Sequence, residues 1–228
     1  MRWGWAWVPI FLCSGCATAT YRPPEGIGVQ VLSLDVAPAP RVLSLGPYRL
    51  LQVLRILDVG PLPFAEDGGS YTVRTGAEYS FQDAAGALGR VTIVKEIDVA
   101  VGPEGDGQMS LSVTSITLDL SRANTETAVR RSLGSDAFLE LRVPETFVVQ
   151  FDFRAWSEGG PTTLWDHPVG LQFLRGGRAV GAVSLLPPTV YYGSEALDPQ
   201  TAIAVLTAFE TATQTFDPGP ITLPSRND

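Results

Sequence analysis

His167 is the only histidine in the chain, and histidine is the side chain whose ordinary pKa best suits a general base at neutral pH. A nucleophilic triad also needs a positioned nucleophile and an orienting carboxylate. No Gly-x-Ser-x-Gly elbow is present, and the neighbouring Asp166 is expected to point away from His167. The sequence therefore predicts that the chain is not an enzyme, with a hydrolase that uses His167 as an alternative.

The sequence predicts no metal site and no cofactor. Zinc sites use several histidine or cysteine ligands, and this chain has one histidine and only two cysteines, Cys13 and Cys16. Glu104 and Asp106 lie in a glycine-rich loop without the spaced oxygen ligands that calcium requires. These acidic residues are expected to be solvated side chains of a turn.

Residues 1–16 have the pattern of a secretory signal peptide. Arg2 is followed by an apolar run over 3–12 and then by Cys13-Ser14-Gly15-Cys16. A helix that spans a bilayer needs about 20 apolar residues, and this run is shorter and contains Pro9. The segment is therefore expected to be removed rather than kept as a membrane anchor.

The Ser-Gly-Cys ending resembles the lipobox of bacterial lipoproteins. The resemblance implies cleavage after residue 15 and acyl chains on Cys16, which becomes the new N-terminus. Cys13 departs from the family, which prefers leucine at that position, and ordinary secretion is the competing interpretation. Ala17 is not the aspartate that retains many lipoproteins at the inner membrane, so the resemblance favours the outer membrane of the cell envelope.

The charge and composition limit the partners. A formal net charge of −8 gives no electrostatic footprint for nucleic acid and no basic patch for anionic lipid headgroups. Attachment to the membrane is therefore expected through the acyl chains. After cleavage Cys16 is the only cysteine left, so no intramolecular disulfide forms. The hydrophobic share of 45% is typical of a folded domain.

The sequence divides into four parts. Residues 1–15 are the signal peptide, 16–28 the lipidated N-terminus with a flexible tether, 29–216 a single β-rich domain, and 217–228 a peripheral tail. Proline and glycine in the tether and in the tail argue against regular structure there. We see no linker that indicates a second domain.

The domain is expected to be mainly β, a single β-barrel or β-sandwich of about a dozen strands. Two apolar runs separated by Gly176-Gly177 predict a hairpin, and a longer turn over 83–89 predicts another. A short helix is predicted over 124–133, capped by Asn124. A second helix should begin after the N-cap Asp198 and be buried, because its apolar residues cover more than one face. Within it Glu210 should lie near an end or an opening.

The hairpin over 79–94, together with the hairpin and apolar helix over 170–216, resembles the tubby-like superfamily. That superfamily includes the phospholipid scramblase and LURP-one-related proteins. The resemblance implies a closed β-barrel of about a dozen strands around a hydrophobic C-terminal helix. The N-terminal third does not match, and the helix predicted at Asn124 departs from the pattern.

Ligand contacts are expected at two places. Trp156 and Trp165 flank a loop rich in glycine and proline, where aromatic side chains often line a ligand mouth, although packing in the core is the commoner role. Leu206 and Phe209 of the C-terminal helix face the expected interior. We therefore predict a lipid-anchored binding or assembly module, with an apolar ligand as one form. The alternative is an accessory lipoprotein subunit of an envelope transport complex.

Overall fold

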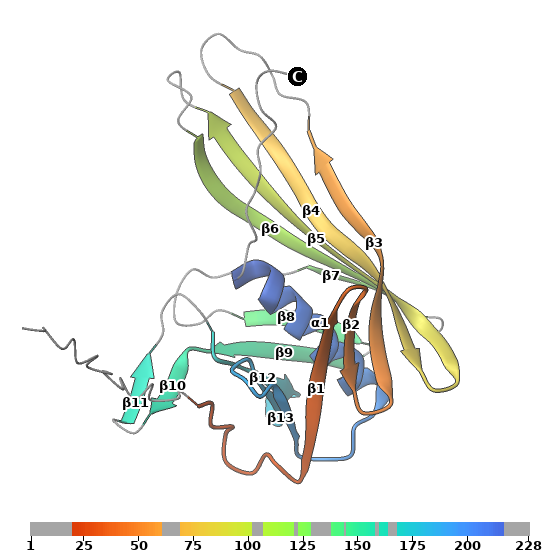
Figure 1. Ribbon diagram of the computed structural model, residues 1–228, viewed down its shortest axis with the longest axis vertical. Coiled ribbons are helices and arrows are strands. Elements are labelled where there is room, and N and C mark those ends of the chain that lie inside the picture. Colours follow the sequence, from red (N-terminus) through yellow and green to blue (C-terminus); the bar gives the residue numbers. More distant parts are fainter. Residues whose placement is uncertain are drawn as a thin grey trace, which may run out of the picture.

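The structure is a computed structural model that describes residues 20–60, 69–101, 107–120, 123–128, 138–143, 145–157, 160–163 and 168–216. The described chain is mainly β, with one helix near its C-terminal end (Figure 1). In chain order the elements are β1 Gln30–Pro38, β2 Arg41–Leu45, β3 Tyr48–Val59, β4 Gly69–Asp83, β5 Gly86–Val101, β6 Gly107–Leu120, β7 Ala123–Ala128, β8 Phe138–Val143, β9 Glu145–Asp152, β10 Arg154–Ser157, β11 Gly160–Thr163, β12 Gly170–Arg175, β13 Arg178–Ser184, β14 Val190–Gly193 and α1 Pro199–Phe216.

Among the described residues, twelve strands form one antiparallel sheet in the order β7-β6-β5-β4-β3-β2-β1-β14-β13-β12-β9-β8. The strand β1 joins its two halves. Gln30 to Ser33 pair with β14, whereas Leu34 to Pro38 pair with β2. The sheet therefore has two limbs, which we call the β2–β7 limb and the β8–β14 limb. The strands β10 and β11 form a separate two-stranded hairpin.

The sheet is not a closed barrel. Its two outermost strands, β7 and β8, lie near each other, but no backbone ladder joins them in the described part of the chain. The closed barrel that the tubby-like resemblance implies is therefore not what this chain forms. Closure requires hydrogen bonds between the first and last strands, and here the two limbs meet without them.

The helix α1 begins where the sequence predicted. The Asp198 carboxylate accepts hydrogen bonds from the backbone N–H groups of Gln200 and Thr201, at 2.8 and 2.9 Å, and Pro199 occupies the first helical position. Every side chain from Thr201 to Ala212 is buried. Such burial is possible because both limbs of the sheet contact the helix. The prediction of a buried C-terminal helix is confirmed.

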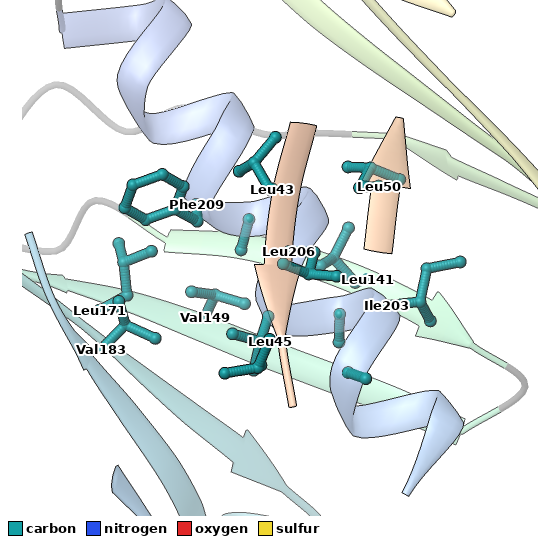
Figure 2. Packing of buried hydrophobic residues seen from close by; sticks show 14 of the residues in the cluster. Leu43, Leu45, Leu50, Leu141, Val149, Leu171, Val183, Ile203, Leu206 and Phe209 are labelled. Carbon is teal, nitrogen blue, oxygen red and sulfur yellow. The ribbon is translucent and has the colours of Figure 1, made fainter. Parts of the chain in front are cut away.

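The core is the space between the two limbs, and α1 fills it. Figure 2 shows side chains from β2, β3, β8, β9, β12 and β13 gathered around the helix. Leu43 and Leu45 reach it from the β2–β7 limb, and Val149 and Leu171 reach it from the β8–β14 limb. Burial of an aliphatic side chain contributes about 2 kcal/mol, so this cluster is the main source of stability.

The predicted helix over 124–133 is wrong for the residues that the structure describes. Ala123 to Ala128 form the strand β7, which pairs with β6 from Asn124 opposite Asp119 to Ala128 opposite Ser115. A short isolated helix is marginal, and Thr125 and Thr127 are β-branched residues that favour strands. A complete ladder with β6 therefore prevails over the local capping signal. Residues 129–133 lie outside the described part.

The two predicted hairpins form, with one difference. Gly176 and Gly177 both have positive φ and connect β12 to β13, as expected for a two-residue turn. The other turn is shorter than the predicted loop over 83–89, because β4 and β5 pair as far as Asp83 and Gly86. The Asp83 carboxylate accepts the N–H of Ala85 at 2.7 Å, which stabilises the tight turn.

Residues 20–28 are packed against the domain and are not the flexible tether that the sequence predicts. Thr20 forms a β-bridge with Trp156, and Tyr21 is buried. Farther along, the Gly28 N–H donates to the Gly193 carbonyl at 3.2 Å. The aromatic ring of Tyr21 packs on the outer face of the β8–β14 limb. Proline and glycine content alone does not predict this contact.

Four strands extend beyond the core as an arm, which we define as 52–59 of β3, 69–76 of β4, 94–101 of β5 and 107–115 of β6. Figure 1 shows these strands running together to the upper end of the molecule. The pairing of β2 with β3 ends at Leu51 and that of β7 with β6 ends at Ser115. Beyond those points, the described residues supply no further strand at either edge of the arm.

Gly76 sits at the base of the arm, where β4 and β5 approach too closely for a side chain. A Cβ there would collide with the carbonyl oxygen of Ile93 and lie 2.9 Å from the Cα of Val94. We expect Gly76→Ala to lower the free energy of unfolding by about 2–3 kcal/mol, because backbone atoms cannot move aside as a side chain can. Urea denaturation measures this change. Thr75→Ala is the neighbouring control and should cost under about 1 kcal/mol; equal losses would contradict the close approach.

Candidate functional site

Among the predicted site residues that the structure describes, Trp156 lies apart from Leu206 and Phe209. Leu206 and Phe209 lie in the core cluster around α1. Trp156 lies on β10, in the separate hairpin, and belongs to neither limb of the sheet. Cys16, Trp165 and His167 fall outside the described residues. The predicted ligand mouth and the predicted interior are thus two different places in the fold.

A buried polar cluster surrounds Glu210, whose side chain is 1% exposed in the middle of the apolar helix. Arg41 of β2 holds it with Nε 2.8 Å from both carboxylate oxygens and with Nη2 2.7 Å from Oε2. The Tyr79 hydroxyl donates to Oε1 at 2.5 Å, and the Gln214 amide donates to the same oxygen at 2.9 Å. Glu210 itself is buried, but Arg41, which contacts it, is 28% exposed, so the cluster reaches toward the surface through its arginine.

The chemistry of this cluster is charge neutralisation. A buried carboxylate is costly without a counter-ion and hydrogen-bond donors, and Glu210 has both. Burial raises the pKa of Tyr79, and the adjacent Glu210 carboxylate raises it further, so the phenol stays protonated as a donor. The hydrogen bonds described above join Glu210 to an arginine, a tyrosine and a glutamine side chain. We interpret the cluster as the polar lock that fixes α1 against β2 and β4.

The sequence singles out Glu210 as a charged residue in an otherwise apolar helix but predicts no partner for it. Nothing in the spacing identifies Arg41 or Tyr79. They lie 169 and 131 positions away along the chain. Their placement opposite Glu210 depends on the register of β2 and β4 within the sheet.

The β10–β11 hairpin and the N-terminal segment form a second feature. The Thr20 N–H donates to the Trp156 carbonyl at 2.7 Å, and the Trp156 N–H donates back at 2.8 Å. The Arg22 guanidinium lies over the Trp156 indole, 4.3 Å from the ring centroid. A cation over an aromatic face is attracted by about 0.5–1 kcal/mol at an exposed site. We call Thr20, Arg22, β10 and β11 the hairpin end of the domain.

Tyr21 attaches this end to the sheet. Its ring covers Gly170 so closely that a Cβ on the glycine would collide with it. Its hydroxyl is buried and finds no hydrogen-bond partner among the described residues. Burial raises the pKa of Tyr21, and the nearby Asp152 carboxylate raises it further, so the side chain remains a neutral aromatic plug.

Exposed apolar side chains lie on two stretches of the described chain, the edge of the arm on β3 and the region from Val29 to Val36 at β1. Val53 and Leu54 of β3 are about half exposed, and Leu57 is 74% exposed. Val53 is the extra residue of a bulge, because Gln52 pairs with Tyr79 and Leu54 with Glu78. Arg55 and Asp58 are also exposed on this strand. The edge thus combines apolar side chains, two opposite charges and backbone groups that no other described strand pairs with.

Comparison with protein-family models, with curated proteins and with solved structures finds no match to the chain. Within the described ranges, no helix is both long enough and apolar enough to cross a membrane. The same residues contain no group of three or more potential metal ligands.

The polar lock predicts a large difference between two arginine substitutions. Arg41→Met should lower the free energy of unfolding by about 3 kcal/mol, because it leaves the Glu210 carboxylate buried without a cation. Arg74→Met is the matched control, since the Arg74–Glu96 pair has a similar 2.7 Å contact but an arginine side chain that is 53% exposed. It should cost under about 1 kcal/mol.

Denaturant titration of both variants and of Arg41→Met with Glu210→Gln checks the origin of the loss. The double variant should recover part of the stability, because an amide at position 210 carries no charge. A loss in Arg41→Met no larger than that in Arg74→Met would show that the cluster is not a lock.

Proposed function

We propose that this chain is a lipid-anchored protein of the bacterial envelope that acts as a non-enzymatic assembly module. Its arm would serve as the docking surface for a protein partner. The observation that carries the proposal is the free edge over 52–59 of β3, where Leu57 is 74% exposed. An accessory subunit of an envelope transport complex is the form of the proposal that this edge favours.

The packed interior supports assembly over storage of an apolar ligand. Leu206 is fully buried and Phe209 is 5% exposed, and both belong to the cluster that joins the two limbs. The interior also holds the Arg41–Glu210 lock, so a ligand that displaced α1 would have to separate a buried ion pair. Exposed apolar side chains that a partner could contact therefore lie on the arm, whereas the apolar side chains around α1 are buried.

The edge chemistry defines the partner. An exposed strand offers backbone groups that an extended segment of another protein can complete, and the alternate side chains give specificity. Arg55 and Asp58 require an acidic and a basic residue at matching positions of the added strand, with apolar side chains against Leu57. The same charges and the bulge at Val53 disfavour pairing with an arbitrary strand. We therefore expect a specific envelope protein with a complementary strand.

The anchor is tested by the intact mass of the membrane-extracted protein. We expect a mature chain that begins at Cys16 and carries acyl chains, because residues 1–16 resemble a lipoprotein signal. Cys16→Ala should remove the acyl mass and release the domain from the membrane fraction. A mature, unmodified wild-type protein in the soluble fraction would contradict the anchor.

The docking surface is tested by the size of the detergent-extracted protein from its own organism, measured by native mass spectrometry. We expect a complex of fixed composition that contains a second envelope protein. Leu57→Asp should reduce its abundance at least tenfold, because the substitution places a charge in the apolar centre of the edge.

Val29→Asp is the matched control, since Val29 is 82% exposed but precedes β1, outside the arm. It should leave the complex intact. A wild-type monomer, a complex made only of this chain, or equal loss in both variants would each overturn the docking proposal.

A further inference from the structure

The ordered N-terminal segment limits how far the domain can lie from a membrane. Thr20 is fixed by two backbone hydrogen bonds to Trp156 and is followed by the buried Tyr21. Only three residues separate it from Cys16 in the sequence. A fully extended chain spans at most about 3.3–3.6 Å per residue, so the Cα atoms of Cys16 and Thr20 are at most about 14 Å apart.

This distance is comparable with the polar layer of a bilayer. The headgroup region on each side of the hydrocarbon core is about 6 Å thick. An acylated Cys16 sits at that layer, because its lipid chains occupy the hydrocarbon. The hairpin end, which begins at Thr20, therefore has to lie at or just above the headgroups.

The side chains at this end suit such a position. Trp156 is partly exposed and carries Arg22 over its ring, and tryptophan and arginine are both favoured at the boundary between water and lipid. Arg154 is nearby on β10, but its Nε lies 3.5 Å from the Asp152 carboxylate. Arg22 is thus the residue best placed to meet a lipid phosphate.

We infer that the hairpin end, with Arg22 and Trp156, is the face of the domain that rests on the phospholipid headgroups. The inference depends on the proposed anchor at Cys16. In Figure 1 the hairpin end and the tip of the arm lie at opposite ends of the view. Seating the hairpin on the membrane would therefore direct the arm away from it, and β5, with 16 residues, alone has a length of about 50 Å.

The test uses the mature acylated protein in vesicles of phosphatidylethanolamine and phosphatidylglycerol that contain a headgroup-labelled quencher lipid. Cys16 is blocked by its lipid, so an introduced cysteine can be labelled with a fluorophore selectively. Pro161→Cys labels the hairpin, where Pro161 is exposed opposite Trp156. Asp58→Cys labels the arm instead, near the end of β3, where Asp58 is exposed.

We expect the quencher lipid to reduce fluorescence at position 161 at least twofold and to leave position 58, on the arm, nearly unchanged. Arg22→Gln should decrease the quenching at position 161 about twofold, whereas Arg178→Gln, which removes an exposed charge beside the Gly176-Gly177 turn, should not. Tryptophan emission and urea denaturation of each variant verify that the domain is folded.

The outcomes separate this inference from the anchor on which it depends. An acylated protein with equal quenching at the two labels would overturn the membrane-facing hairpin and leave the anchor intact. Strong quenching at position 161 that Arg22→Gln does not change would overturn the role of Arg22, and proximity would then come from the tether alone. Absence of acyl mass would overturn both proposals, and the mass measurement identifies that case before any fluorescence is recorded.

Discussion

The burial of α1 between the two limbs of one sheet is the constraint on which the rest of the structure depends. A helix that is apolar on nearly all sides needs partners on nearly all sides. The sheet supplies them because β1 pairs with β14 over its first residues and with β2 over the later ones. Glu210 adds a second requirement, since its carboxylate can be buried only where Arg41, Tyr79 and Gln214 converge. The helix position and the registers of β2 and β4 are thus fixed together.

Because of this constraint, the surfaces that we propose for binding lie on the outside of the molecule. The helix occupies the space that a ligand would need, and the polar lock makes its displacement costly. The strands β4 and β5 are longer than the helix, so β3, β4, β5 and β6 continue past the core as the arm. Their edge and the hairpin end are surfaces with features that packing in the described core does not explain. The proposals for a protein partner and for a lipid surface follow from these two places.

Sequence patterns identified the elements that local chemistry controls. Asp198 and Pro199 start α1, and Gly176-Gly177 connects two strands, because capping and turn formation involve neighbouring residues. The same local logic failed at Asn124, where a capping residue lies in the strand β7. It also failed at Tyr21, whose binding place beside Gly170 is far away in the sequence. In both cases a contact with a distant strand outweighed the local signal.

The sequence by itself determined the mainly β character of the domain and the start and burial of the C-terminal helix. Only the tertiary structure decided that the sheet is open, that Arg41 and Tyr79 neutralise Glu210, that residues 20–28 are attached to the domain, and that Leu57 is exposed on a free edge. The physical reason is the range of the interactions. Periodicity and capping are encoded within a few residues, whereas strand order and register set which distant side chains meet, and no local pattern records that choice.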